Sequence, residues 1–199
     1  LEADRPETRP IDGRADPAGG FWIETMSKRG QTEPGSIYRF YKGDLRKLYA
    51  DIAIPNSICF DPAGEFALYT DTLDGRVYRQ PLDGEGWPSG APHVFLDGRC
   101  DGKLFDGSVI DGDGNMWNAE YGAGCVTAYD RDGTQIHRVE IPAAYTTCPA
   151  FGGTSLRDLF VTTARQDIAE ADLARNPNAG CTFVIEDVAP GVPEPRVRQ

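Results

Sequence analysis

Two oxygen-bearing side chains, Asn56 and Asp106, occupy the same place in two copies of an internal repeat. Each lies five residues before the aspartate of a tight turn, Asp61 or Asp111. Because a repeat brings equivalent residues to equivalent places, we expect the two side chains to face each other at one end of the fold. Their oxygens are the ligands that a hard divalent cation needs, and the pair therefore predicts a metal site. The alternative is that each side chain only bonds its own turn backbone.

Arg9 and Asp12 lie at the corresponding end of the first copy of the repeat. Ile11 takes the place there that Asn56 and Asp106 hold in the later copies. An arginine at this position could hold a hydroxyl-rich or anionic ligand. The alternative is an arginine exposed on a loop.

Other catalytic and metal-binding motifs are missing from the sequence. The stretch 111–115 begins like an EF-hand loop, but Met116 stands where that loop needs glycine and Gly122 where it needs glutamate. His93 and His137 are isolated, with no HxH or HExxH spacing, which argues against the usual zinc hydrolases. The sequence contains no GxSxG motif, no Walker motif and no GxGxxG after a strand.

The elements that must position these residues are short strands joined by recurring turns. The turns at 16–19, 61–64 and 111–114 follow one another at spacings of 45 and 50 residues, and a weaker copy lies at 148–153. A period of this length, made of strands and turns, is typical of β-propeller blades. One four-stranded blade cannot cover both of its faces, so successive blades stack. We therefore predict an all-β fold, a single β-propeller domain over residues 1–199 with about four blades.

Alternating apolar residues predict strands, and Gly- and Pro-rich stretches predict loops between them. The strands are expected at 21–26, 36–41, 45–54, 57–60, 65–70, 75–80, 93–96, 108–110, 116–117, 125–129, 135–141, 159–161 and 181–186. Residues 1–11 are polar and Pro-rich and predict a loop. Residues 167–175 give the only convincing helical pattern.

The composition excludes several classes of partner. With 31 acidic and 20 basic residues the net charge is −11, which argues against nucleic acid and anionic membrane surfaces. No stretch approaches 18 apolar residues, so no transmembrane helix is expected. The five cysteines are odd in number and form no CxxC pair, which predicts free thiols in a reducing compartment. With no visible signal peptide, we expect a cytoplasmic protein.

Four motifs, in this order, resemble the gluconolactonase/regucalcin (senescence marker protein) family, and most closely its bacterial sugar-lactonase branch. They lie at 13–23, at 54–60, at 106–107 with 113–117, and at 148–153 with 161–164. The resemblance covers nearly the whole chain. It implies a six-bladed β-propeller with one divalent metal ion at the mouth of its channel, and hydrolysis of sugar lactones to aldonic acids.

The resemblance also implies roles for particular residues. Asn56 matches a metal ligand, and Asp106 matches both a metal ligand and the presumed catalytic base. Arg9, with Asp12, matches the substrate-contacting Arg-x-Asn-Asp-Gly motif. The expected cofactor is calcium or zinc, although manganese and magnesium also accept such oxygen ligands. The expected partner is a small sugar lactone, and the oligomeric state stays open.

The chain departs from the family pattern in three respects. Ile11 replaces the motif's asparagine, and Glu24 stands where the family usually has glycine. The family's third metal ligand is a glutamate that would precede Leu1. We therefore expect a chain that lacks its N-terminal blades. A non-catalytic metal-binding or scaffold propeller is the alternative function, and the strictosidine synthase and paraoxonase relatives share the fold.

Overall fold

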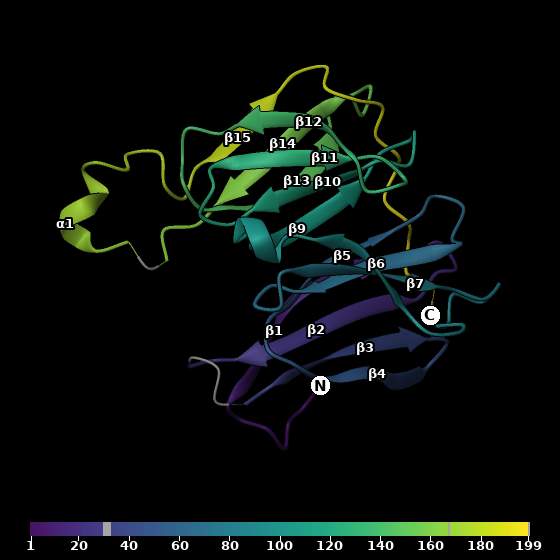
Figure 1. The fold of residues 1–199 in the computed structure, drawn as a ribbon. Helices are drawn as coiled ribbons and strands as arrows, with labels where there is room; N and C mark the ends of the chain where they lie inside the picture. The colour runs from purple at the N-terminus through teal and green to yellow at the C-terminus, as the bar shows by residue number, and fades with distance from the viewer. Residues whose placement is uncertain (30–32, 167, 199) are drawn as a thin grey trace.

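Four antiparallel sheets stack one after another in the computed structural model, which describes residues 1–29, 33–166 and 168–198 (Figure 1). The first sheet is β1 (Thr8–Ala15), β2 (Phe21–Ser27), β3 (Gly35–Tyr41) and β4 (Asp44–Ile52). The second is β5 (Pro55–Phe60), β6 (Phe66–Asp71), β7 (Arg76–Pro81) and β8 (His93–Asp97). The third is β9 (Phe105–Ile110), β10 (Met116–Glu120), β11 (Cys125–Tyr129) and β12 (Gln135–Glu140). The fourth is β13 (Thr146–Gly152), β14 (Asp158–Thr163) and β15 (Thr182–Ile185).

Strands that follow each other in sequence pair side by side in every sheet. The first strands of successive sheets, β1, β5, β9 and β13, also contact one another. The described helical segments are a single 3₁₀ turn at Arg99–Asp101 and the short helix α1 (Glu170–Leu173), which projects from the sheets (Figure 1). The predicted all-β propeller with about four blades is confirmed.

Buried aspartates build the recurring turns between the first two strands of a sheet. Asp16, Asp61 and Asp111 are fully buried. Asp111 Oδ1 accepts hydrogen bonds from the backbone N–H groups of Asp113 at 3.0 Å and Asn115 at 2.8 Å. The carboxylates thus bond their own turn backbone, as Asx turns do. The prediction that 111–115 is a structural turn is therefore confirmed.

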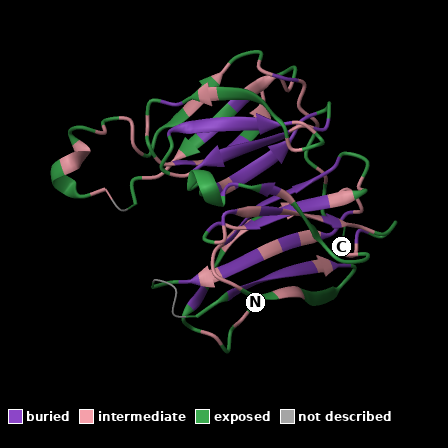
Figure 2. Cartoon of the chain, viewed as in Figure 1, coloured by how far each residue is buried: buried purple, intermediate pink, exposed green. Residues whose placement is uncertain are grey.

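Tryptophans after two of these turns tie neighbouring sheets together. Trp22 Nε1 donates to Asp16 Oδ2 at 3.2 Å, and Trp117 Nε1 donates to Asp111 Oδ2 at 2.8 Å. Trp22 then packs edge-on against Phe60 of the second sheet, at 5.4 Å between ring centroids. The apolar core consequently forms between successive sheets, and the outer strands β4 and β12 are largely exposed (Figure 2).

The C-terminal tail returns across the turn ends of the sheets. The backbone N–H of Gly112 donates to the Pro190 carbonyl at 2.6 Å, and that of Arg198 donates to the Gly19 carbonyl at 2.8 Å. These contacts lie beyond the C-terminal ends of β9 and β1. The tail therefore leaves the opposite end of the inner strands, where Arg9 and Asp106 lie, uncovered.

Two sequence predictions need correction. Residues 8–11 are not a loop, because β1 begins at Thr8 and pairs with β2. The hydrogen-bond partners of this polar, Pro-containing strand come from β2, which its own local pattern could not show. The predicted helix at 167–175 shortens to Glu170–Leu173, which buries no residue against the sheets. Asp167 lies outside the described residues.

Two further predictions concern the cysteines and the membrane. All five cysteines are free thiols in the structure. None of the helices in the described ranges is long and apolar enough to cross a membrane.

Candidate active site

The inner strands of the first three sheets each carry a β-bulge at the same place. At each bulge two residues of the first strand stand opposite one residue of the second: Ile11 and Asp12 opposite Glu24, Ser57 and Ile58 opposite Tyr69, and Asp106 and Gly107 opposite Ala119. A bulge bends its strand and changes the direction of the side chains around it. The repeat seen in the sequence is therefore also a repeat of strand irregularities.

The bulges border a cavity of about 370 Å³, within the size range of small-molecule sites. Its walls include residues from the first strand of all four sheets. The lining residues are Arg9, Ile11, Asp12, Met26, Ile54, Asn56, Thr72, Asp106, Gly107, Tyr121, Thr147, Cys148, Ala164 and Gln166. The structure thus brings together every residue that the sequence singled out for metal or substrate binding. Their roles stay predictions.

Asn56 and Asp106 face each other in this cavity. The side chain of Asn56, which is only 5% exposed, lies near enough to the carboxyl group of Asp106 to lower its pKa. Asn56 Oδ1 accepts a hydrogen bond from the backbone nitrogen of Ser57 at 3.3 Å, and the backbone N–H of Gly107 lowers the pKa of Asp106. Asn56 therefore bonds its neighbouring backbone, as expected if it had only a structural role in its turn. Each of the two side chains also turns towards its counterpart across the sheet boundary.

The cavity raises the pKa of its carboxyl groups. Burial, followed by the charge of Asp12, raises the pKa of Asp106 to about 7, against the lowering effect of the Asn56 and Gly107 hydrogen bonds. Burial also raises the pKa of Asp12, whose Oδ1 accepts from the Gly13 N–H at 2.7 Å. A carboxyl with a pKa near 7 exchanges a proton readily at neutral pH, as a general base must.

Arg9 lies at the edge of the cavity with an exposed side chain. Its Nη1 donates to the Pro10 carbonyl at 3.0 Å, which holds the guanidinium against its own strand. Ile11 lines the same wall and presents only carbon atoms to the cavity. Strand β1 thus contributes one cationic, one anionic and one apolar side chain.

Glu24 is a buried carboxyl beside the site whose environment the sequence did not reveal. The side chain is fully buried, and neither carboxylate oxygen has a hydrogen-bond partner within the described ranges. Burial, and then the charges of Asp12 and Asp106, raise its pKa well above the usual value. An unpaired buried charge is costly, so we expect Glu24 to be neutral at pH 7. Ala119 occupies the corresponding place in the third sheet.

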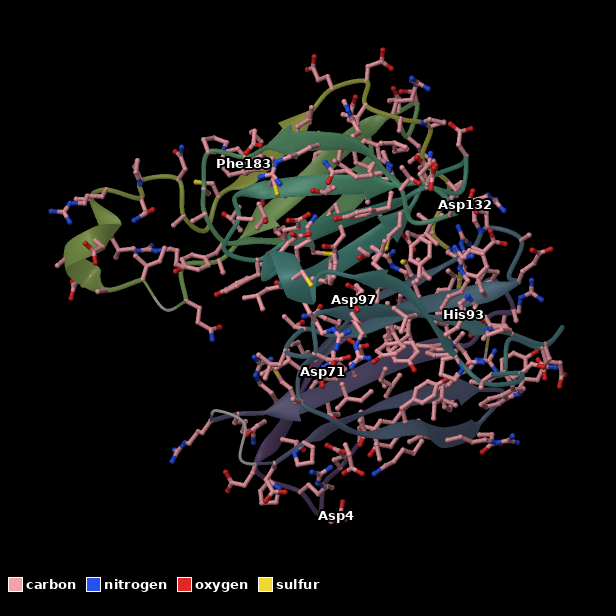
Figure 3. All side chains as sticks on the ribbon, in the orientation of Figure 1. Asp4, Asp71, His93, Asp97, Asp132 and Phe183 are labelled. Carbon is pink, nitrogen blue, oxygen red and sulfur yellow. The ribbon has the colours of Figure 1, made fainter. Side chains whose placement is uncertain are left out.

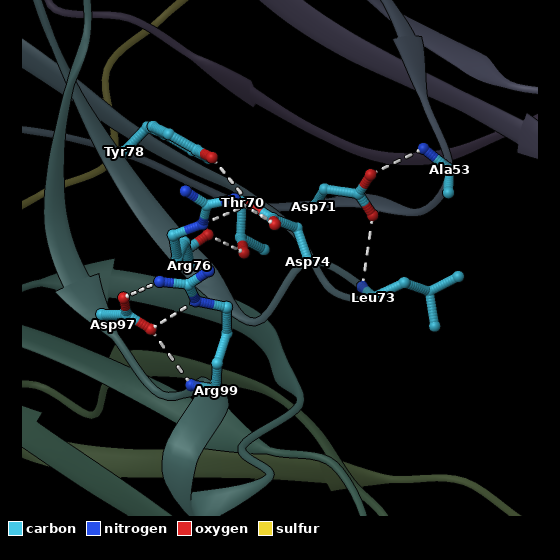
Figure 4. A network of polar contacts seen from close by, with 9 residues as sticks. All are labelled: Ala53, Thr70, Asp71, Leu73, Asp74, Arg76, Tyr78, Asp97 and Arg99. Atoms are coloured by element: carbon cyan, nitrogen blue, oxygen red, sulfur yellow. Dashed lines mark hydrogen bonds and ion pairs between the residues drawn. The ribbon is translucent and has the colours of Figure 1, made fainter.

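Asp71 fixes the segment that leads into Asn56. Its carboxylate accepts from the backbone N–H of Ala53 at 2.9 Å (Figure 4). It also accepts from the backbone N–H of Ile54 at 3.1 Å. The same carboxylate accepts from the Leu73 N–H at 3.2 Å, which shapes the turn that carries the cavity residue Thr72. The bonds of Asp71 to Ala53 and Ile54 could not be predicted from the sequence, because they join residues 18 and 17 positions apart through a loop.

Charge pairs on β6 to β8 support that turn from outside. Arg76 pairs with Asp74 at 2.6 Å, and Arg99 pairs with Asp97 at 2.6 Å (Figure 4). His93 is exposed on the outer strand β8, away from the cavity lining (Figure 3). His137 on β12 packs edge-on against Trp117, at 5.7 Å between ring centroids. Neither histidine is among the residues that line the cavity.

The donor atoms at the cavity suit a hard cation. Within residues 1–29, 33–166 and 168–198, no three His, Cys, Asp or Glu side chains lie close enough to hold a metal on their own. A cation here would therefore be held by one amide oxygen of Asn56, one carboxylate oxygen of Asp106, and oxygens from water or a ligand. Such mixed oxygen sets are those that calcium and magnesium accept.

Comparison with known sequences decides the family. The profile described as "SMP-30/Gluconolactonase/LRE-like region" matches residues 1–165. The chain belongs to this family. It is 38% identical over 98% of its length to a Rhizobium meliloti protein named "Putative sugar lactone lactonase", of which it covers 67%. It is 32% identical over 92% of its length to the 6-deoxy-6-sulfogluconolactonase of Pseudomonas putida, of which it covers 64%.

Solved structures are also similar to this chain. A calcium-binding protein, regucalcin, from Agrobacterium tumefaciens superposes with a TM-score of 0.96 and 44% identity, over all of this chain and 68% of the other. A luciferin-regenerating enzyme at 24% identity, with a TM-score of 0.89, shares the fold. The chain spans about two thirds of the length of the relatives it matches.

Proposed function

We propose that the protein hydrolyses a sugar lactone to the corresponding aldonic acid in this cavity, with a divalent cation bound at Asn56 and Asp106. The observation that carries the proposal is the meeting of these two side chains in one cavity of small-molecule size. The names of the relatives, a sugar lactone lactonase and a sulfogluconolactonase, support the substrate class.

Asn56 and Asp106 would hold the cation through their side-chain oxygens. Calcium or zinc are the ions we favour, and the name of the regucalcin structure supports calcium. Manganese and magnesium suit the same oxygens. A bound divalent cation acts as a Lewis acid, which stabilises negative charge that develops on a carbonyl oxygen.

Asp106 acts as the general base in this proposal. Its carboxylate accepts a proton from the attacking water, whose oxygen forms a bond to the lactone carbonyl carbon. The bond from that carbon to the ring oxygen then breaks, and the ring oxygen takes up the proton that Asp106 accepted from the water, which gives the hydroxyl of the aldonic acid and restores the carboxylate. Arg9 donates hydrogen bonds to substrate hydroxyls or to the ring oxygen, and Asp12 accepts from a substrate hydroxyl.

The test is a panel of γ- and δ-lactones of aldonic acids, assayed with and without added calcium, zinc, manganese or magnesium. The chelator-treated protein should be inactive, and one ion should restore the release of acid. If no ion supports hydrolysis of any lactone, while an ion still binds, the catalytic proposal fails.

A non-catalytic metal-binding propeller is the second candidate, and Ile11 is the observation that favours it. This side chain leaves an apolar surface in the cavity where the family motif has asparagine. Ile11→Asn would restore the amide at that place. Hydrolysis that appears only in Ile11→Asn would support the non-catalytic function for the natural chain. Equal hydrolysis by both proteins would exclude it.

A further inference from the structure

Asn118 on β10 is a fully buried amide. It contacts the backbone of Asp106 and the side chain of Ser57, the residue that follows Asn56. Its Nδ2 lies 3.0 Å from the backbone oxygen of Asp106 and 3.3 Å from that of Gly107. The same nitrogen lies 3.2 Å from Ser57 Oγ, on the neighbouring sheet, and 2.8 Å from Ser108 Oγ. One side chain therefore meets the Asp106 bulge and the residue next to Asn56.

The orientation of this amide follows from its partners. Backbone carbonyl oxygens can only accept hydrogen bonds, so the NH₂ group of Asn118 must point towards Asp106 and Gly107. An amide turned the other way would place its oxygen against two carbonyl oxygens. Asn118 thus donates to the backbone of the bulge through its NH₂ group.

Ser57 completes the connection between the two sheets. Its hydroxyl donates to the backbone oxygen of Asp106 at 2.5 Å, and its φ angle is +64°, a left-handed conformation that is uncommon outside glycine. Such a conformation persists when surrounding contacts hold it. The Asp106 carbonyl therefore accepts from Ser57 and from Asn118 at once, and this ties the strand of Asn56 to the strand of Asp106.

The propeller fold does not by itself need an amide at this place. The residues that occupy the corresponding position beside the bulges of the first and second sheets are Ile23 and Leu68. Both sheets form their bulges with an apolar side chain there. The amide occurs, among these three sheets, in the one that carries Asp106.

We propose that Asn118 is a positioning residue that sets the distance and orientation between Asn56 and Asp106. It acts on the backbone of the Asp106 bulge and, through Ser57, on the strand of Asn56. Only the use of Asn56 and Asp106 to bind a cation rests on the proposed function. The effect of Asn118 on the distance and orientation between these two side chains does not depend on it.

The experiment compares Asn118→Leu, which copies the side chain of the second sheet, with Ser57→Ala, which removes only the hydroxyl. Tyr49→Phe is the matched control, because it removes a 2.7 Å hydrogen bond from Tyr49 to Gln80 that also joins two sheets but lies outside the cavity lining. The first readout is the calcium and zinc dissociation constant by calorimetry. The second is the ¹H–¹⁵N resonance of the Asn56 side-chain amide, which is visible without metal.

We expect Asn118→Leu to weaken cation binding about 10- to 100-fold, as the loss of an outer hydrogen bond to a metal ligand does. It should also shift the Asn56 resonance, and Ser57→Ala should do the same more weakly. Tyr49→Phe should change neither readout. An unmoved Asn56 resonance in folded Asn118→Leu and Ser57→Ala overturns the positioning role, whether or not cations bind. If the wild type binds no cation but the resonance moves, the positioning role stands and the metal part of the proposed function fails.

Discussion

The side chains of Asn56 and Asp106 belong to neighbouring sheets and line the same cavity, where Asn56 lowers the pKa of Asp106, although the two residues are separated by 50 positions in the sequence. The internal repeat makes this meeting possible, because Asp106 lies in the bulge of its inner strand and Asn56 directly precedes the bulge of its own. The charge of Asp12 and the burial of the site then set the protonation of Asp106. Its chemistry thus depends on the first sheet as well as on the third.

Cation binding should depend on pH through Asp106. Its pKa of about 7 means that a proton occupies the carboxylate below that pH, and a cation must displace this proton. We therefore expect the apparent calcium affinity to fall about tenfold for each pH unit below 7 and to level off above it. Calorimetry between pH 5.5 and 8.5 checks this. A constant affinity between pH 5.5 and 7 would show that Asp106 is not a ligand.

Glu24 should lower the stability of the protein increasingly as pH rises. Its pKa is raised in the folded state, so the folded protein holds a proton that the unfolded chain releases above its ordinary pKa of about 4.3. The free energy of unfolding therefore decreases as pH rises from that value, by about 1.4 kcal/mol per unit, until the folded-state pKa is reached.

The variant Glu24→Gln removes this titration at nearly constant volume. We expect its stability relative to the wild type to rise as the pH increases above the ordinary glutamate pKa, measured by urea unfolding at each pH. Glu33→Gln, at an exposed position, is the control and should show little trend. A difference between Glu24→Gln and the wild type that does not change with pH would mean that Glu24 is charged in the folded protein.

The turn aspartates should differ in their contribution to stability. Asp111 accepts from two backbone N–H groups, the Asn115 amide and the indole of Trp117, whereas the sheet of Asp61 has Ala67 in place of the tryptophan. Removing an acceptor from a buried donor costs about 1–3 kcal/mol. We expect Asp111→Ala to lose roughly 3 kcal/mol and Asp61→Ala about 1 kcal/mol less, measured by urea unfolding. Equal losses would show that the Asn115 and Trp117 bonds to Asp111 add no more stability than the Arg131 contact adds to Asp61.

The sequence predicted the parts of the site that depend on the repeat. The spacing of Asp61 and Asp111 placed Asn56 and Asp106 at equivalent positions, and the structure brings them together. The start of β1 at Thr8 was missed, because its pairing with β2 is long-range and its local pattern is polar.

The bulges and the buried polar residues beside them could not be predicted. A bulge depends on the register between two strands, which alternation within one strand does not show. The burial of Glu24 depends on which side of the β1 bulge it faces. The contacts of Asn118 depend on a sheet 61 residues away in sequence. A signal was nevertheless present, since Asn118 is polar where the other copies have Ile23 and Leu68.

The most direct measurement is lactone hydrolysis by the wild type, Asp106→Asn and Asp132→Asn, each with the ion that supports activity. Asp132 lies in the exposed turn between β11 and β12, so its variant makes the same chemical change outside the cavity (Figure 3). Asp106→Asn should lose about 10²- to 10⁴-fold in kcat, as the loss of a general base does, and should bind the cation more weakly. Asp132→Asn should match the wild type. Near wild-type hydrolysis by Asp106→Asn would contradict the account.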